Sequence, residues 1–162
     1  MNMTAAITVI AAVVTAGAIS IAVPPNAAAD NNPVVKAFGT PERVDNGAGT
    51  VVTGWRVYYL KPSMDLVSWP VHGHLWEAAA TVRADRGTAT PVITDLNARA
   101  DNGQTYQAIP AASAHGINPA TLSQGGNSTG KLYFDVVGAR PDSVVYDAGG
   151  RDLLDWVQPK QP

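Results

Sequence analysis

The fold of this chain is decided by residues 75–85, which read LWEAAATVRAD. The three alanines would suit a helix, but a helix would place the charged Arg83 on the same stripe as Trp76, Ala79 and Ala80. A period of two sorts the segment better, because successive side chains of a strand point to opposite faces. One face then carries Trp76, Ala78, Ala80, Val82 and Ala84, and the other carries Glu77, Thr81, Arg83 and Asp85. The alternation predicts a β-strand.

The same pattern recurs on both sides of this segment. In 131–137, Leu132, Phe134 and Val136 share one face, while Lys131, Tyr133 and Asp135 share the other. Further strands are predicted at 34–38, 50–59, 91–99, 104–109, 143–146 and 153–157. Turn-forming residues lie between several of them, as at Asp101-Asn102-Gly103. About seven short strands without a convincing helix predict an all-β protein built as an antiparallel two-sheet sandwich.

The N-terminus differs sharply from the rest of the chain. An apolar run at 5–23 is followed by Pro24-Pro25-Asn26 and then by Ala27-Ala28-Ala29. Small residues after an apolar centre are typical of a secretory signal, so we predict a signal helix at 1–29, cleaved before Asp30. An uncleaved anchor is the alternative, because the run is long enough to span a bilayer. The mature protein is then expected to be secreted and extracellular, without a permanent membrane span.

The mature chain is expected to form one domain. We predict a loosely ordered lead-in at 30–49, a β-sandwich at 50–157 and a loose tail at 158–162. The 11 Lys and Arg and 13 Asp and Glu of the chain, with a formal net charge of −2, all follow residue 29. Because the basic residues are scattered singly between acids, the sequence argues against a nucleic-acid partner. There is no cysteine, so the fold must depend on its core rather than on disulfides.

Two patterns suggest catalysis or metal binding. Residues 126–130 read GNSTG and match the G-x-S-x-G elbow of serine hydrolases, which needs a strand before it and a helix after it. Here a predicted strand follows, so a turn entering that strand is the favoured interpretation, and no enzymatic activity or cofactor is predicted. The alternative is a serine hydrolase that uses Ser128 with His115 or His72.

His72-Gly73-His74 is the second pattern, because histidines two apart on a strand point to the same side. A zinc site needs at least one more protein ligand, from Asp65, Glu77 or His115, so surface histidines are favoured over a metal-binding protein. Asp147, Asp152 and Asp155 lack the spacing of a calcium loop. Of the four tryptophans, Trp69 stands in a loop before Pro70, so Trp69, His72 and His74 are the predicted ligand or partner contacts.

Several blocks of the sequence resemble a known family. They are Gly54-Trp55-Arg56-Val57, Leu75-Trp76-Glu77-Ala78, Asn97-Ala98-Arg99, residues 128–136 (STGKLYFDV) and residues 152–156 (DLLDW). Together they are similar to the small secreted immunogenic proteins of mycobacteria. The resemblance implies an immunoglobulin-like, cysteine-free β-sandwich with no established catalytic residues. It leads us to expect a non-enzymatic antigen. Because loops on a rigid sandwich often carry recognition, we also expect its end loops and exposed sheet edges to bind a protein of the cell envelope or of a host surface.

Overall fold

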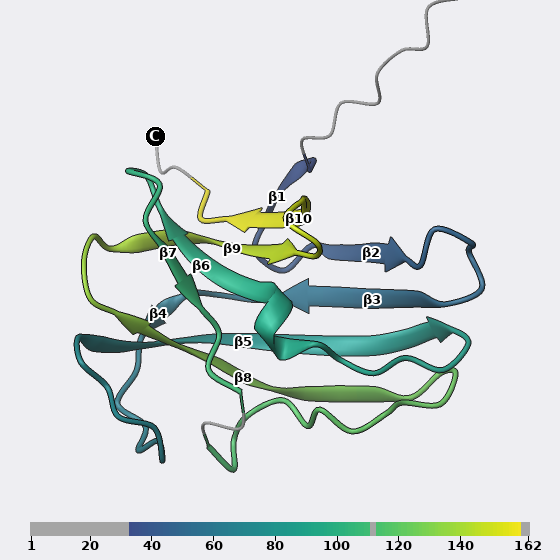
Figure 1. The fold of residues 1–162 in the computed structure, drawn as a ribbon, viewed down its shortest axis with the longest axis horizontal. Coiled ribbons are helices and arrows are strands. Elements are labelled where there is room, and N and C mark those ends of the chain that lie inside the picture. The colour runs from purple at the N-terminus through teal and green to yellow at the C-terminus, as the bar shows by residue number, and fades with distance from the viewer. Residues whose placement is uncertain (1–32, 111–112, 160–162) are drawn as a thin grey trace, which may run out of the picture.

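The computed structural model describes residues 33–110 and 113–159, and within them the regular structure is almost entirely β (Figure 1). The strands are β1 (Val35–Ala37), β2 (Pro41–Asp45), β3 (Val52–Val57), β4 (Lys61–Pro62), β5 (His74–Arg86), β6 (Leu96–Ala100), β7 (Thr105–Gln107), β8 (Asn127–Val136), β9 (Pro141–Asp147) and β10 (Asp152–Val157). One 3₁₀ turn, η1 (Ile93–Asp95), precedes β6. The all-β prediction is confirmed. The predicted signal helix and its cleavage site lie outside the described residues.

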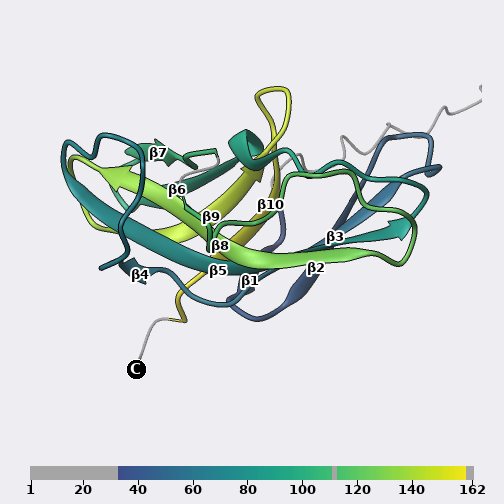
Figure 2. The same cartoon turned by 90° about the horizontal axis from the view of Figure 1, so that it is seen from below.

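The strands form two sheets that face each other, as the view from below shows (Figure 2). One sheet has the order β1-β10-β9-β6-β7. The other has the order β2-β3-β5-β4, with β8 also paired to β5. All pairings between named strands are antiparallel except the edge pair β1 and β10, which is parallel. The predicted β-sandwich is therefore confirmed, with one parallel edge that the sequence did not indicate.

The core lies between the sheets and follows the alternation of β5. Its inward side chains, from Trp76 to Ala84, are all buried as predicted. Trp55 on β3 and Trp156 on β10 are the largest fully buried side chains, and Trp156 donates its indole N–H to the carbonyl of Thr40 at 2.8 Å. The small side chains of β5 leave room between the sheets for these bulky rings, which remove much apolar surface from water.

Three local predictions were wrong. Pro41–Asp45, placed in the loose lead-in, forms β2, because its backbone pairs along β3 from Arg56 to Val52. The predicted strand at 91–99 begins with the turn η1 and becomes extended only at Leu96. β8 begins at Asn127, four residues before the predicted start, because its polar first half continues the ladder with β5. For β2 and β8, pairing with a distant strand outweighed the local pattern.

The outer face of β8 is partly covered, which the alternation did not predict. Tyr133 points away from the core between the sheets, yet it is only 1% exposed. Ile109, Val67 and Leu75 pack with it in a second, small apolar cluster. Through Val67, this second cluster attaches the loop at residues 63–73 to the outer face of the sandwich.

Candidate functional site

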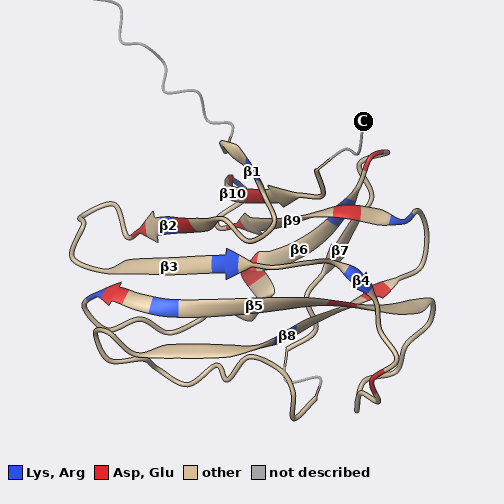
Figure 3. Ribbon diagram, turned by 180° about the vertical axis from the view of Figure 1, so that it is seen from behind, with Lys and Arg blue, Asp and Glu red and all other residues tan. Residues whose placement is uncertain are grey.

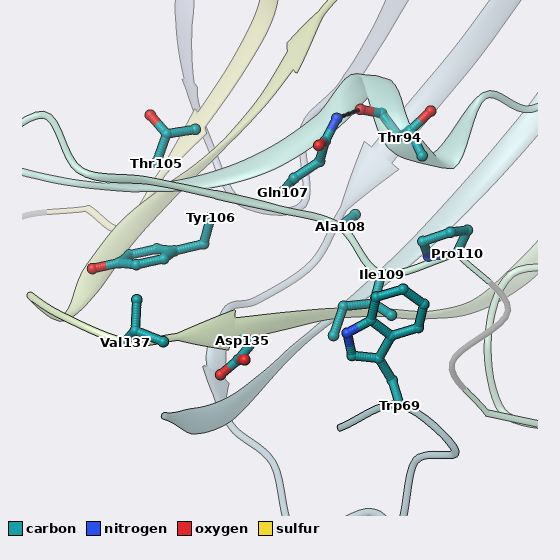
Figure 4. A pocket seen from close by; sticks show the side chains of 10 residues that line it. All are labelled: Trp69, Thr94, Thr105, Tyr106, Gln107, Ala108, Ile109, Pro110, Asp135 and Val137. Atoms are coloured by element: carbon teal, nitrogen blue, oxygen red, sulfur yellow. Dashed lines mark hydrogen bonds between the residues drawn. The ribbon is translucent and has the colours of Figure 1, made fainter. Parts of the chain in front are cut away.

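A cleft of about 470 Å³ opens where β7 and the end of β8 separate. Ala108 and Phe134 still form an antiparallel bridge, but beyond it the two strands diverge. Figure 4 shows the lining, with Trp69, Ile109 and Pro110 on one side of the view and Tyr106 and Val137 on the other. Asp135 lies between these groups. The cleft therefore combines an apolar lining with one carboxylate.

Asp135 fixes the loop that carries Trp69. Its Oδ2 accepts a hydrogen bond from the backbone N–H of His72 at 2.9 Å, and its Oδ1 accepts one from Gly73 at 2.8 Å. The Nδ1 atom of His72 lies 3.1 Å from the same Oδ2. Burial alone would raise the pKa of Asp135, but the hydrogen bonds from the backbone of His72 and Gly73 hold it below its usual value. The cleft thus has a fixed negative charge at neutral pH.

Trp69 and His72 meet at this site, and His74 lies close by. The indole of Trp69 is 51% exposed and lines the cleft directly. His72 reaches the cleft through Asp135, and its side chain is 73% exposed. His74 is the first residue of β5, opposite Val136 on β8. Of the three residues predicted as contacts, Trp69 lines the cleft and His72 borders it through Asp135, whereas neither His74 nor Ser128 lines it.

The outer edge of β7 faces the cleft with free backbone groups. Ala108 and Gln104 bond to β6, through Leu96 and Ala100 respectively. Because an antiparallel ladder alternates, Thr105 turns its backbone N–H and C=O groups away from β6, whereas the same edge at Gln107 already meets β8 at the bridge between Ala108 and Phe134. β7 is the last strand of its sheet, so on the Thr105 side of that bridge its edge is open to another extended segment.

The proposed metal ligands do not converge. Asp65 and Glu77 both bind the ammonium of Lys131, at 2.7 and 2.9 Å, and His115 Nδ1 lies 3.7 Å from Asp65. A lysine thus stands between the carboxylates that would have completed a site with His72. Among residues 33–110 and 113–159, no group of three or more His, Cys, Asp or Glu side chains is arranged to hold a metal ion.

The cluster around Lys131 is a closed ionic network. Tyr133 donates its hydroxyl to Asp65 at 2.6 Å, and Ser63 donates to Glu77 at 2.7 Å. Hydrogen bonds with both carboxylates raise the pKa of Lys131, while the pKa of Asp65 is lowered mainly by its hydrogen bond from Lys131. Every charge in the network has an opposite partner, which suits a structural role under the 63–73 loop.

Ser128 does not stand on a nucleophile elbow. It lies inside β8, paired with Val82, so the segment is neither the predicted turn nor a strand-to-helix junction. Its Oγ accepts a hydrogen bond from the backbone N–H of Asn118 at 3.0 Å. His72 is bound to Asp135, and His115 stands beside Asp65. Neither histidine is placed as a base for this hydroxyl.

The aspartates near the β9–β10 turn are held by an arginine. Arg99 donates from Nη2 to Asp152 at 2.6 Å and lies 3.7 Å from Asp147. The guanidinium therefore neutralises two of the three acids that suggested a calcium loop.

Within the described residues, no helix is long and apolar enough to cross a membrane.

Comparison with known proteins fits this architecture. A sequence model of a domain of unknown function, DUF1942, matches residues 33–156. The chain belongs to the DUF1942 family. Immunogenic protein MPB63 of Mycobacterium bovis is 40% identical over 158 residues, which cover 96% of this chain and 99% of the relative. Immunogenic protein MPT63 of Mycobacterium tuberculosis matches to the same extent.

A solved structure supports the same relationship. The 1.5 Å crystal structure of MPT63, described as a secreted protein from Mycobacterium tuberculosis, is 41% identical with a TM-score of 0.73. The match covers 78% of this chain and 98% of that one. The resemblance to secreted mycobacterial immunogenic proteins, inferred from short sequence blocks, is thereby confirmed. These DUF1942 relatives are named as antigens, not as enzymes.

Sequence reasoning missed most of the cleft lining. Asp135 was placed on the outward face of its strand, but nothing local showed that it would hold His72 and Gly73, more than 60 positions away. Ile109 and Val137 belong to segments that meet only in the folded DUF1942 domain. The one sequence signal for this site was the position of Asp135, an acidic residue near the end of the strand predicted at 131–137.

Proposed function

We propose that the chain is a secreted, non-enzymatic binding module that receives an extended segment of a protein of the cell envelope or of a host surface. The site is the cleft between β7 and β8. The observation that carries this proposal is Trp69, a large aromatic side chain that is half exposed above a cleft with a free strand edge.

The apolar lining supports a protein partner. Val137 is 66% exposed, and together with Trp69, Ile109 and Pro110 it offers pockets for apolar side chains. Exposed tryptophans at a concave, partly apolar surface are common anchors of protein interfaces. Asp135 adds a charge that favours a basic residue in the bound segment.

The strand edge supports an extended conformation of the partner. The outward N–H and C=O groups of Thr105 can pair with a peptide added beside β7. In such strand addition the backbone bonds supply affinity, and alternate side chains enter pockets that supply specificity. The cleft lies beside β7, so the side chains of a peptide added there could enter it.

A peptide library tests the proposal. Random peptides displayed on phage are selected on the folded protein and counter-selected on the variant Trp69→Ala. Enriched peptides are expected to be extended, with a basic residue beside apolar ones. In two-dimensional NMR they should shift the amide signals of Thr105, Gln107 and Val137, and Trp69→Ala should weaken their binding at least tenfold.

A matched control is Tyr58→Ala, which removes an exposed aromatic side chain from a different surface. Peptide binding by this variant should equal that of the wild type. Peptides that bind Trp69→Ala as tightly as the wild type, or that shift amides away from β7, would overturn the proposal. Failure of the library to yield any saturable binder would do the same.

A further inference from the structure

Four of the seven arginines of the chain lie on one outer surface, far from the cleft. Arg43 on β2, Arg56 on β3 and Arg83 on β5 line one hollow of about 340 Å³, and Arg86 lines an adjoining hollow with Arg43. Figure 3 shows blue segments on the neighbouring strands β2, β3 and β5. In the sequence these residues are isolated, and only the pairing of the three strands gathers them. We call this surface the arginine face.

Asp85 organises the arginine face. Its Oδ2 accepts a hydrogen bond from Arg43 Nε at 2.7 Å, and its Oδ1 lies 3.3 Å from Arg83 Nε. The carboxylate rests over Gly54, where a Cβ atom would approach it to 2.8 Å. Both guanidiniums approach Asp85 through Nε. Their side chains are 73% and 61% exposed.

The charge on the arginine face is positive although the chain as a whole is negative. The four arginines face two acidic neighbours, Asp85 and the exposed Asp45 at the end of β2. Glu42 also borders the hollow, but it pairs with the core residue Trp55 and so belongs to the inner face of β2. The arginine face therefore has an excess of positive charge within a chain whose formal charge is −2.

Aromatic and hydroxyl groups adjoin the arginines. The guanidinium of Arg56 lies 5.9 Å from the ring centroid of Tyr58, which is 42% exposed. The hydroxyls of Tyr58 and Thr81 are 3.3 Å apart, and that of Thr129 is 2.8 Å from Thr81. Guanidiniums suit sulfate, phosphate and carboxylate groups, and exposed aromatic rings and hydroxyls suit a sugar.

We infer that the arginine face binds an anionic oligosaccharide, with its sulfate or phosphate groups on Arg43, Arg56 and Arg83 and a sugar ring against Tyr58. This site is separate from the proposed protein-binding cleft, since the two lie towards opposite ends of β5. His74 begins that strand near the cleft, whereas Arg83 and Arg86 are at its other end. The two proposals can therefore fail independently.

Titration calorimetry on the folded protein tests the inference with defined probes. A heparin-derived hexasaccharide represents sulfated glycans, and a phosphorylated mannose oligosaccharide represents phosphorylated ones. Saturable binding of either probe at low salt supports the inference, and the preferred probe identifies which anionic group is recognised. Binding should weaken at least tenfold in R43Q/R83Q and several-fold in R56Q, while an uncharged mannose oligosaccharide should not bind.

Matched variants separate recognition from folding and from general attraction. Arg140→Gln removes an exposed arginine that stands over Trp76, and it should bind like the wild type. Arg56→Gln leaves the ion pairs of Asp85 with Arg43 and Arg83 in place, so its loss of binding cannot come from an unpaired Asp85. Thermal unfolding of each variant verifies that it is folded.

Three outcomes would overturn the inference. The first is the absence of saturable binding by both charged probes at millimolar concentration. The second is equal binding by R43Q/R83Q, R56Q and the wild type. The third is equally tight binding of a single-stranded oligonucleotide of the same charge, which would show a surface that attracts any polyanion rather than a glycan site.

Discussion

The ammonium of Lys131 lies 2.9 Å from Oε2 of Glu77, a residue that is only 3% exposed. A charge this far from solvent is tolerated because Lys131 neutralises it and because Ser63 and Tyr59 also donate hydrogen bonds to the carboxylate. Burial alone would raise the pKa of Glu77, but these partners hold it below its usual value. The network anchors the loop that bears the proposed binding site.

Replacement of Lys131 by methionine should destabilise the fold. It removes the cation that is nearest to the buried carboxylate of Glu77, which we expect to lower the free energy of unfolding by about 3 kcal/mol. Urea denaturation at pH 7 measures the change. The control is Lys61→Met, because Lys61 lies 3.6 Å from Glu77 with a side chain that is 58% exposed and should contribute less than about 0.5 kcal/mol. Equal losses in the two variants would contradict the argument.

Replacement of Glu42 by glutamine should make stability less dependent on pH. Burial raises the pKa of Glu42 from 4.5 to about 7, and its Oε2 is buried without a hydrogen-bond partner. A raised pKa means that the folded state prefers the protonated acid. The contribution of protonated Glu42 to stability is therefore complete below pH 4.5 and is lost as the pH rises through 7.

Glu42→Gln should therefore raise the free energy of unfolding at pH 8 by about 1 kcal/mol, allowing for partial exposure, and should change it little at pH 4.5. Urea denaturation at both pH values provides the measurement. A gain of the same size at both would show that the effect does not come from ionisation.

Gly130 should not tolerate a side chain. A Cβ atom at this position would lie 2.6 Å from the carbonyl oxygen of Gly116 and 2.7 Å from the nitrogen of Ile117, both in the segment that crosses over β8. Gly130→Ala is expected to displace that segment and to lower the melting temperature by several degrees. Asn127→Ala, at the exposed start of β8, serves as the control and should melt like the wild type. An unchanged melting temperature in Gly130→Ala would contradict the close packing.

Removal of the Asp135 carboxylate should loosen the loop beside the cleft. In Asp135→Ala, the amides of His72 and Gly73 lose their acceptor, and we expect their hydrogen exchange to accelerate at least tenfold. The amide of Ala108, bonded to Leu96 in the β6–β7 ladder, is an internal reference that should not change. Acceleration of all three amides would point to global destabilisation instead.

Ser128 should not react as a hydrolase nucleophile. Its hydroxyl is inside β8 and accepts a hydrogen bond from Asn118, and neither His72 nor His115 contacts it. A serine-reactive fluorophosphonate should leave the folded protein unlabelled by mass spectrometry, while an active serine hydrolase in the same tube is labelled. Stoichiometric labelling of Ser128 would overturn the non-enzymatic assignment.

The sequence by itself determined the class of fold and its core. Alternation in β5 and β8 identifies which side chains face inward, because a strand buried on one face needs apolar residues at every second position. Three of the four tryptophans are buried, and the loop tryptophan Trp69 is exposed, in agreement with their local sequence. Short, polar strands such as β2 were missed, since they are stabilised by pairing with β3 rather than by a pattern of their own.

Only the tertiary structure decided which charged side chains contact one another. Asp135 meets His72, Lys131 meets Asp65 and Glu77, and Arg43 meets Asp85 through pairings between segments far apart in the chain. A charged side chain on the outer face of a strand looks like ordinary solvated surface in sequence. Its partners are set by strand order and register, and these depend on how the two sheets bury their apolar faces together rather than on any local signal.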